Sequence, residues 1–182
     1  MATVERPLLS KLAKEKRIER CQKMEDWFVS NEGRRGSKRV VLWSDEKLFV
    51  VDQVVNRRNR RVVIKNANVN KQAAMKTKHP SSVMVFGLIA SDGRVMPPFF
   101  VESGVRINAK YYQENILPAV ESWCATEYGV NWRRKVVLMQ DGAPCHTARS
   151  VQSYLAENWG FEAFWPKDLW PPSSPDLNPI DF

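Results

Sequence analysis

Short, largely apolar runs separated by polar segments mark the strands of a sheet along this chain. These runs predict buried strands at residues 40–44, 83–90 and 136–140. The apolar residues 48–51 are expected to return as the hairpin partner of the first run. Residues 95–101 are expected to return from the second run across a turn at Asp92 and Gly93. Residues 161–164 fit a last short strand.

Apolar residues at helical spacing predict three helices. A loose apolar stripe among Lys and Arg predicts a helix over residues 7–28. Stronger stripes predict helices over residues 108–128, where Pro118 is expected to introduce a kink, and over residues 147–159. Because the hairpin strands come first and helices then alternate with strands, the order predicts an α/β fold with a mixed sheet flanked by helices.

Two aspartates follow predicted strands where α/β sheets usually carry their chemistry. Asp45 follows the run 40–44, and Asp141 follows the run 136–140. A carboxylate at the tip of a buried strand is costly unless it is hydrogen-bonded or binds a cation. Since the two runs share one pattern, we expect adjacent, parallel, central strands with Asp45 and Asp141 side by side. For either aspartate alone, capping of the following turn is the structural alternative.

A third carboxylate, Asp181, follows a helix-start signal in the proline-rich tail. Asn178 suits the N-cap of a helix and Pro179 its first position, so Asp181 could also serve only as a cap. If the three carboxylates converge, their oxygens suit Mg²⁺. Two such ions about 4 Å apart activate a water or a 3′-hydroxyl and stabilise the leaving oxygen in phosphodiester chemistry.

The net charge of +8 is concentrated in one segment. Residues 53–91 contain no Asp or Glu. The cations of this segment are Arg57, Arg58, Arg60, Arg61, Lys65, Lys71, Lys76 and Lys78, and they equal the whole net charge. Such a segment attracts a polyanion such as nucleic acid, although a solvated surface loop has the same composition.

Composition excludes several classes of protein. No run of eighteen apolar residues is present, so no membrane span is predicted, and residues 1–9 do not resemble a secretory signal. The three cysteines are scattered without a CxxC pair, which favours reduced thiols in a cytosolic or nuclear protein. Cys145 and His146 have no partners at zinc spacing, and His146 is expected to begin a helix or to lie near a DNA phosphate.

An ordered set of sequence blocks resembles mariner-type transposases. The blocks are VLWSDEKLF at residues 41–49, NRRNR at 56–60, VMVFG at 83–87, QDGAPCHTA at 140–148 and SPDLNPID at 174–181. They are similar to the family's first-aspartate block, a basic block, the central strand, the second-aspartate block and the last acidic block. Residues 9–20 also resemble the helix that links the family's DNA-binding region to its catalytic core. The likeness therefore covers nearly the whole chain.

The resemblance implies a ribonuclease-H-like fold that cuts and joins DNA. Its DDE/D triad falls on Asp45, Asp141 and Asp181, which would bind two Mg²⁺ or Mn²⁺ ions. Residues 1–37 would form a basic linker helix and loop, and residues 38–182 the catalytic domain. Transposon ends and target DNA are the implied partners, a homodimer is expected of the full-length protein, and the nucleus is the expected location.

The likeness departs from the family's pattern in three places. Asp141 and Asp181 are farther apart than is usual, and the usual spacing would select Asp176, although the motif selects Asp181. No helix-turn-helix region precedes residues 1–20, and Phe182 ends the chain where a further helix is expected. We therefore expect a C-terminally truncated core that binds DNA and binds Mg²⁺ weakly but cleaves little.

Two other interpretations remain open at this stage. A decayed or truncated, non-catalytic nucleic-acid-binding remnant would keep the fold and the basic surface without a competent triad. A ribonuclease or exonuclease of the same fold would use the same metals but should lack the SPDLNP block at residues 174–179.

Overall fold

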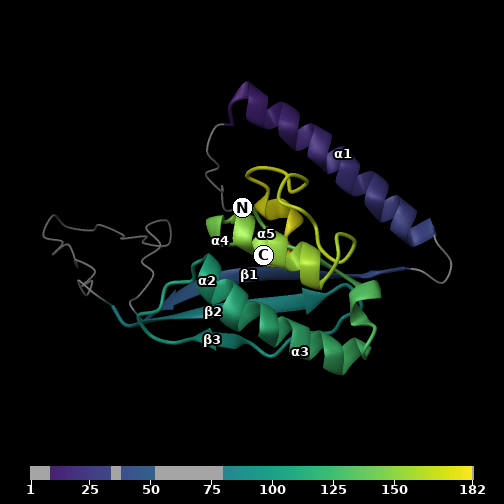
Figure 1. The fold of residues 1–182 in the computed structure, drawn as a ribbon. Helices are drawn as coiled ribbons and strands as arrows, with labels where there is room; N and C mark the ends of the chain where they lie inside the picture. The colour runs from purple at the N-terminus through teal and green to yellow at the C-terminus, as the bar shows by residue number, and fades with distance from the viewer. Residues whose placement is uncertain (1–8, 34–37, 52–79, 182) are drawn as a thin grey trace, which may run out of the picture.

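The computed structural model describes residues 9–33, 38–51 and 80–181, and their centre is a four-stranded mixed sheet (Figure 1). Its strands are β1 (Val40–Val50), β2 (Ser82–Ala90), β3 (Phe99–Val101) and β4 (Val136–Met139). Their order across the sheet is β3-β2-β1-β4. The pairs β1–β2 and β2–β3 are antiparallel, and β1–β4 is parallel. The predicted mixed sheet is confirmed.

Strand β1 is one continuous strand of eleven residues, so the hairpin predicted between residues 40–44 and 48–51 is wrong. Its antiparallel partner is β2, with pairs from Leu42–Ala90 to Val50–Ser82. The intervening residues 45–47 contain no Gly, Pro or Asn to reverse the chain. Since β2 offers an unbroken ladder over this length, the chain stays extended through Asp45.

The predicted turn at Asp92 and Gly93 is confirmed. Gly93 has a φ of 91°, which glycine adopts without steric cost, and its N–H donates to the carbonyl of Ala90. The strand that returns from this turn is short, because Pro97 and Pro98 have no N–H groups for the ladder. Before β3, the return is reduced to a single bridge at Val95.

The strand predicted at residues 161–164 is likewise reduced to one bridge. Phe164 pairs in parallel with Leu138 of β4, on the edge that faces away from β1. β4 is therefore the last strand of the described sheet, and its predicted central position is wrong. The adjacent and parallel arrangement of residues 40–44 and 136–140 is confirmed.

The helix predicted at residues 108–128 is interrupted. It comprises α2 (Ala109–Tyr111), the π-helical segment Tyr112–Ile116 and α3 (Leu117–Tyr128). The wider turn directly precedes Pro118, which has no N–H to donate to a carbonyl one turn earlier. At the position of the predicted kink, Pro118 therefore accompanies a change in the hydrogen-bonding pattern of the helix.

One face of the sheet carries the larger core. Leu42, Phe86 and Leu138 lie on this face and are nearly fully buried. The residues from the helices that pack against them include Tyr112, Ile116, Leu117 and Val120, and also Val151 and Leu155 of α5 (Arg149–Asn158). α5 occupies most of the helix predicted at residues 147–159.

The opposite face carries a smaller core built on tryptophan. Val41 and Met139 point to this face, where they pack with Trp165, Trp170 and Met24. Met24 belongs to α1 (Lys11–Gly33), and the C-terminal segment lies between α1 and the sheet (Figure 1). Among the described residues, no helix combines the length and apolar character needed to cross a membrane.

Helix α1 begins and ends later than the predicted range 7–28. Its final turn is held by Asn31, whose side chain accepts from the Arg39 N–H and donates to the Arg39 carbonyl, at 2.9 and 3.1 Å. The buried amide of Asn31 therefore joins the end of α1 to the residue that precedes β1.

Candidate active site

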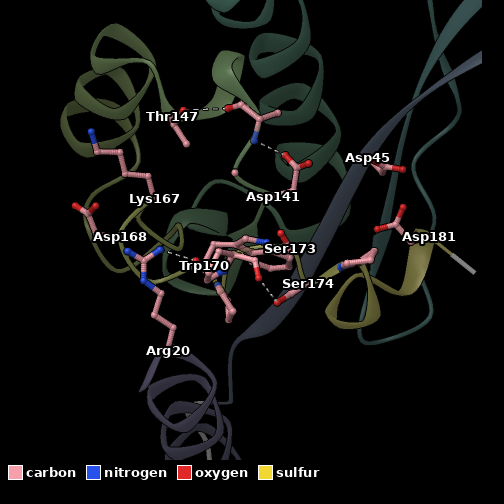
Figure 2. A pocket seen from close by; sticks show the side chains of 15 residues that line it. Arg20, Asp45, Asp141, Thr147, Lys167, Asp168, Trp170, Ser173, Ser174 and Asp181 are labelled. Atoms are coloured by element: carbon pink, nitrogen blue, oxygen red, sulfur yellow. Dashed lines mark hydrogen bonds between the residues drawn. The ribbon is translucent and has the colours of Figure 1, made fainter. Parts of the chain in front are cut away.

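Three aspartates from separate parts of the sequence line one pocket of about 800 Å³ (Figure 2). Asp45 belongs to β1, and Asp141 lies just beyond β4. Asp181 ends the 3₁₀ turn Pro179–Asp181. The structure therefore brings all three predicted site residues to the same pocket.

The register of β1 and β4 accounts for the proximity of the first two. Their last pair is Trp43 with Met139, and Asp45 and Asp141 each lie two residues further along. Beyond this pair β4 has ended, so β1 carries Asp45 past its last pair with the parallel neighbour. Asp45 is therefore within a strand and not at its tip as predicted, but the neighbouring strand does end there.

The position of Asp181 depends on a buried asparagine. Asn178 is 2% exposed, and its Nδ2 donates to the carbonyl of Ser44 at 3.0 Å. Its Oδ1 accepts from the N–H of Ile180 at 3.3 Å. The predicted helix start is thus a 3₁₀ turn that one side chain fastens to β1, beside Asp45.

The rival third carboxylate, Asp176, has a different role. It lies in the 3₁₀ turn Pro175–Leu177 and forms an ion pair with Arg17 of α1 at 2.7 Å. Arg17 also donates to the carbonyl of Ser173 at 2.7 Å. Asp176 therefore fastens α1 to the C-terminal segment, whereas Asp181 faces the pocket.

Burial and the neighbouring carboxylates make the side chain of Asp45 harder to ionise. Burial of its half-buried side chain, and then the charge of Asp181, raise the pKa of Asp45 to about 6, and Glu46 and Asp141 add to the rise. The N–H of Glu46 opposes this effect only in part. Charged carboxylates gathered in this way favour a cation between them.

The raised pKa of Asp45 predicts that the stability of the protein depends on pH. The pKa of Asp45 is higher in the folded protein, about 6, than its ordinary value of 3.8. The folded state therefore binds more protons between these values, and the free energy of unfolding falls as pH rises through this window. Without divalent cations, Asp45→Asn should unfold at a higher temperature than the unsubstituted protein at pH 8, with a gain of about 1 kcal/mol after solvent screening.

Thermal unfolding in EDTA, followed by circular dichroism at pH 8 and at pH 4, measures this gain. The advantage of Asp45→Asn should shrink towards pH 4. Asp168→Asn is the matched control, since Asp168 lines the same pocket but is not among the groups that raise the pKa of Asp45. An advantage of Asp45→Asn that is equal at both pH values would contradict the raised pKa of Asp45.

Asp141 has the opposite electrostatic setting. Burial raises the pKa of Asp141, but hydrogen bonds from His146 and from the N–H of Ala143 outweigh burial and lower it. The Ala143 N–H lies 2.9 Å from Asp141 Oδ1, and His146 Nδ1 lies 2.8 Å from the same oxygen. Asp141 is therefore held in its charged form, with Oδ1 turned toward these donors.

His146 lies beneath the pocket, close to the start of a short helix, which is one of its two expected positions. It belongs to the short helix α4 (Pro144–Thr147), and its side chain is 2% exposed. Its Nε2 lies 3.1 Å from Oε1 of Glu46, a residue that the sequence does not single out. A signal for Glu46 was present, because it alternates with Leu42 and Ser44 on the core-facing side of β1, where a carboxylate needs a partner.

The donor set of the pocket suits a hard divalent cation. Asp45, Asp141 and Asp181 supply carboxylate oxygens, and the raised pKa of Asp45 reflects its burial and then repulsion by Asp181, which a cation would relieve. Within the described residues, however, no group of three or more His, Cys, Asp or Glu side chains is close enough to hold a metal ion as it stands. The carboxylates at the pocket are therefore of the chemical type that binds a divalent cation, but they do not form a complete coordination shell.

Positive charge lines the opposite wall of the pocket. Arg20 of α1 donates to the carbonyl of Trp170 at 2.7 Å, and Lys167 lies nearby on the C-terminal segment (Figure 2). The predicted DNA-binding residues lie outside the described residues; they are Arg57, Arg58, Arg60, Arg61, Lys65, Lys71, Lys76 and Lys78. Arg20 and Lys167 are thus the cations that the structure places at the pocket.

Comparison with known proteins agrees with this geometry. The profile of a family described as DDE superfamily endonuclease matches residues 40–181. A pre-cleavage Mos1 transpososome is similar to the chain with a TM-score of 0.70 and 21% identity, over 100% of this chain and 51% of that one. A Mos1 mariner paired-end complex with Mn gives 0.70 and 22%, over 100% and 50%.

The catalytic domain of Mos1 mariner transposase alone gives a TM-score of 0.62 and 22% identity, over 98% of this chain and 70% of that one. The chain thus spans about half the length of the first two structures and more of the isolated domain. No curated protein sequence matches it significantly. The structural likeness confirms the predicted ribonuclease-H-like fold.

Proposed function

Since the chain belongs to the family of DDE superfamily endonucleases, we propose that it is the catalytic core of a cut-and-paste DNA transposase. In this role it hydrolyses phosphodiester bonds at transposon ends and joins the freed 3′ ends to target DNA. The observation that carries the proposal is the convergence of Asp45, Asp141 and Asp181 on one pocket. Two come from neighbouring parallel strands and the third from a turn fastened to β1.

Mg²⁺ or Mn²⁺ is the cofactor that this donor set suits, and two ions would be held by Asp45, Asp141 and Asp181. When bound, such ions would supply the charge that activates the attacking oxygen and stabilises the leaving oxygen of the phosphodiester. The protein's own part is to gather the carboxylates and to keep Asp141 charged. Mos1 structures with Mn and with Mg support this choice of cofactor.

DNA is the proposed substrate and partner. Solved Mos1 complexes include one with a left transposon end and one described as a strand transfer complex. In this chain, Arg20 and Lys167 would offer positive charge to phosphates at the pocket. The basic segment with Arg57 and Arg58 would bind the phosphates of the duplex without reading its sequence. We also propose that the full-length protein works in the nucleus as a homodimer.

A nicking assay on the protein encoded by the complete reading frame tests this function. We expect cleavage of a duplex that carries transposon ends, dependent on Mg²⁺ or Mn²⁺ and stopped by EDTA. Asp141→Asn should lower the rate by about 10³-fold or more, because it removes a charged ligand of the cation. The matched control is Asp168→Asn, which makes the same change at the same pocket outside the triad.

Equal rates for Asp141→Asn and Asp168→Asn would contradict the proposed triad. DNA binding without metal-dependent cleavage by the unsubstituted protein would indicate a non-catalytic remnant of a transposase instead.

A further inference from the structure

A buried histidine joins a carboxylate on β1 to a carboxylate just beyond the end of β4. His146 Nδ1 lies 2.8 Å from Asp141 Oδ1, and its Nε2 lies 3.1 Å from Glu46 Oε1. The side chains of His146 and Glu46 are only 2% and 13% exposed. Each ring nitrogen of His146 therefore lies within hydrogen-bonding distance of a carboxylate oxygen, so the ring bridges Asp141 and Glu46.

Glu46 does not itself line the pocket. Neighbouring residues of a strand point to opposite faces, so Asp45 points toward the pocket and Glu46 toward the larger core with Leu42. From that face, the side chain of Glu46 contacts the ring of His146, while its charge and its N–H also act on Asp45. A change at Glu46 therefore reaches Asp141 by way of His146.

The ring of His146 is held on its other sides as well. The ring of Tyr112 lies 4.7 Å from it, between centroids, and the side chain of Gln152 donates to the His146 carbonyl at 3.0 Å. The N–H of Ala143 reaches the same oxygen of Asp141 that the ring does, at 2.9 Å. Asp141 Oδ1 thus has two donors beneath the pocket, and Oδ2 is left for a ligand.

Stability alone is a poor reason for such an arrangement. Burying charged groups is costly. Replacing a buried ion pair with apolar side chains of similar volume often leaves a protein at least as stable. Groups that hydrogen-bond to metal ligands, by contrast, set the orientation of those ligands, and their loss typically weakens metal binding by 10–100-fold. Burial opposes protonation of His146, but interactions with Tyr112, Asp141, Cys145 and Glu46 outweigh it and raise the pKa of His146.

We propose that Glu46 and His146 are positioning residues, which turn the Asp141 carboxylate so that one oxygen is presented to a divalent cation in the pocket. The proposal rests on the proposed function for its cation, but the contacts that carry it are those of the protein alone. Neither residue touches the reacting atoms.

Titration with Mn²⁺, with free Mn²⁺ followed by electron paramagnetic resonance, tests the proposal. Glu46→Ala should raise the dissociation constant for Mn²⁺ by about 10–100-fold. Glu46→Gln, which keeps a carbonyl oxygen as acceptor, should restore most of the affinity. The matched control is Glu121→Ala. Glu121 is a carboxylate of α3 that accepts hydrogen bonds from Tyr154 and Trp159 and has no described link to the pocket.

A second measurement needs no metal. The amide resonance of Ala143, which donates to Asp141, should shift in Glu46→Ala and stay in place in Glu121→Ala. If Glu46→Ala does not fold, Glu46→Asp, which shortens the reach by one methylene, should produce the same shift. An unmoved Ala143 resonance, or unchanged Mn²⁺ affinity in Glu46→Ala where Asp141→Ala loses it, would overturn the proposal. Failure of the unsubstituted protein to bind Mn²⁺, with the resonance still shifting, would instead overturn the proposed function.

Discussion

Asp181→Ala is expected to abolish metal-dependent cleavage, with a loss of about 10³-fold or more, while DNA affinity stays nearly unchanged. The substitution removes one of three carboxylates at the pocket and leaves Arg20, Lys167 and the basic segment intact. Cleavage by the protein of the complete reading frame, measured beside a gel-shift titration of the same duplex, separates the two effects.

Asp176→Ala is the matched control for Asp181→Ala. Asp176 pairs with Arg17, and both side chains are partly exposed, so its loss should cost about 0.5–1 kcal/mol of stability. Cleavage per folded molecule should be retained. The reverse result, with cleavage lost in Asp176→Ala and kept in Asp181→Ala, would move the third carboxylate to Asp176.

Asn178→Ala is expected to lower cleavage by about 10²-fold, although Asn178 carries no charge and does not line the pocket. Its side chain ties the turn with Asp181 to the carbonyl of Ser44, next to Asp45. Without it, the Ser44 carbonyl loses a buried donor and Asp181 loses its fixed distance from β1. The free energy of unfolding should fall by about 1–3 kcal/mol.

Asn31→Ala distinguishes misplacement of Asp181 from general loss of stability. Asn31 is also buried, and its side chain also makes two hydrogen bonds to backbone groups, both at Arg39. Its substitution should lower the unfolding temperature by a similar amount, with cleavage per folded molecule unchanged. Equal cleavage by Asn178→Ala and Asn31→Ala at a temperature where both are folded would show that Asn178 does not position Asp181.

The local pattern of the sequence determined which segments are strands and helices. The apolar runs at 83–90 and 136–140 needed no distant partner to be recognised, and Asp92 with Gly93 specified its turn. These signals succeed because alternation, burial and turn geometry depend on neighbouring residues. The parallel pairing that brings Asp45 and Asp141 together also followed, from the pattern that the two runs share.

Tertiary structure decided what local pattern leaves open. β1 continues through Asp45 because β2 pairs with its residues 42–50. Residues 161–164 make a single parallel bridge to β4, at Leu138. Asp181 and not Asp176 reaches the pocket because Arg17, far away in the sequence, takes Asp176, and Asn178 anchors the other turn. Glu46 and His146 meet across a hundred residues of sequence. Each of these outcomes is a contact between distant segments, whose free energy depends on burial and geometry that exist only once the chain has folded.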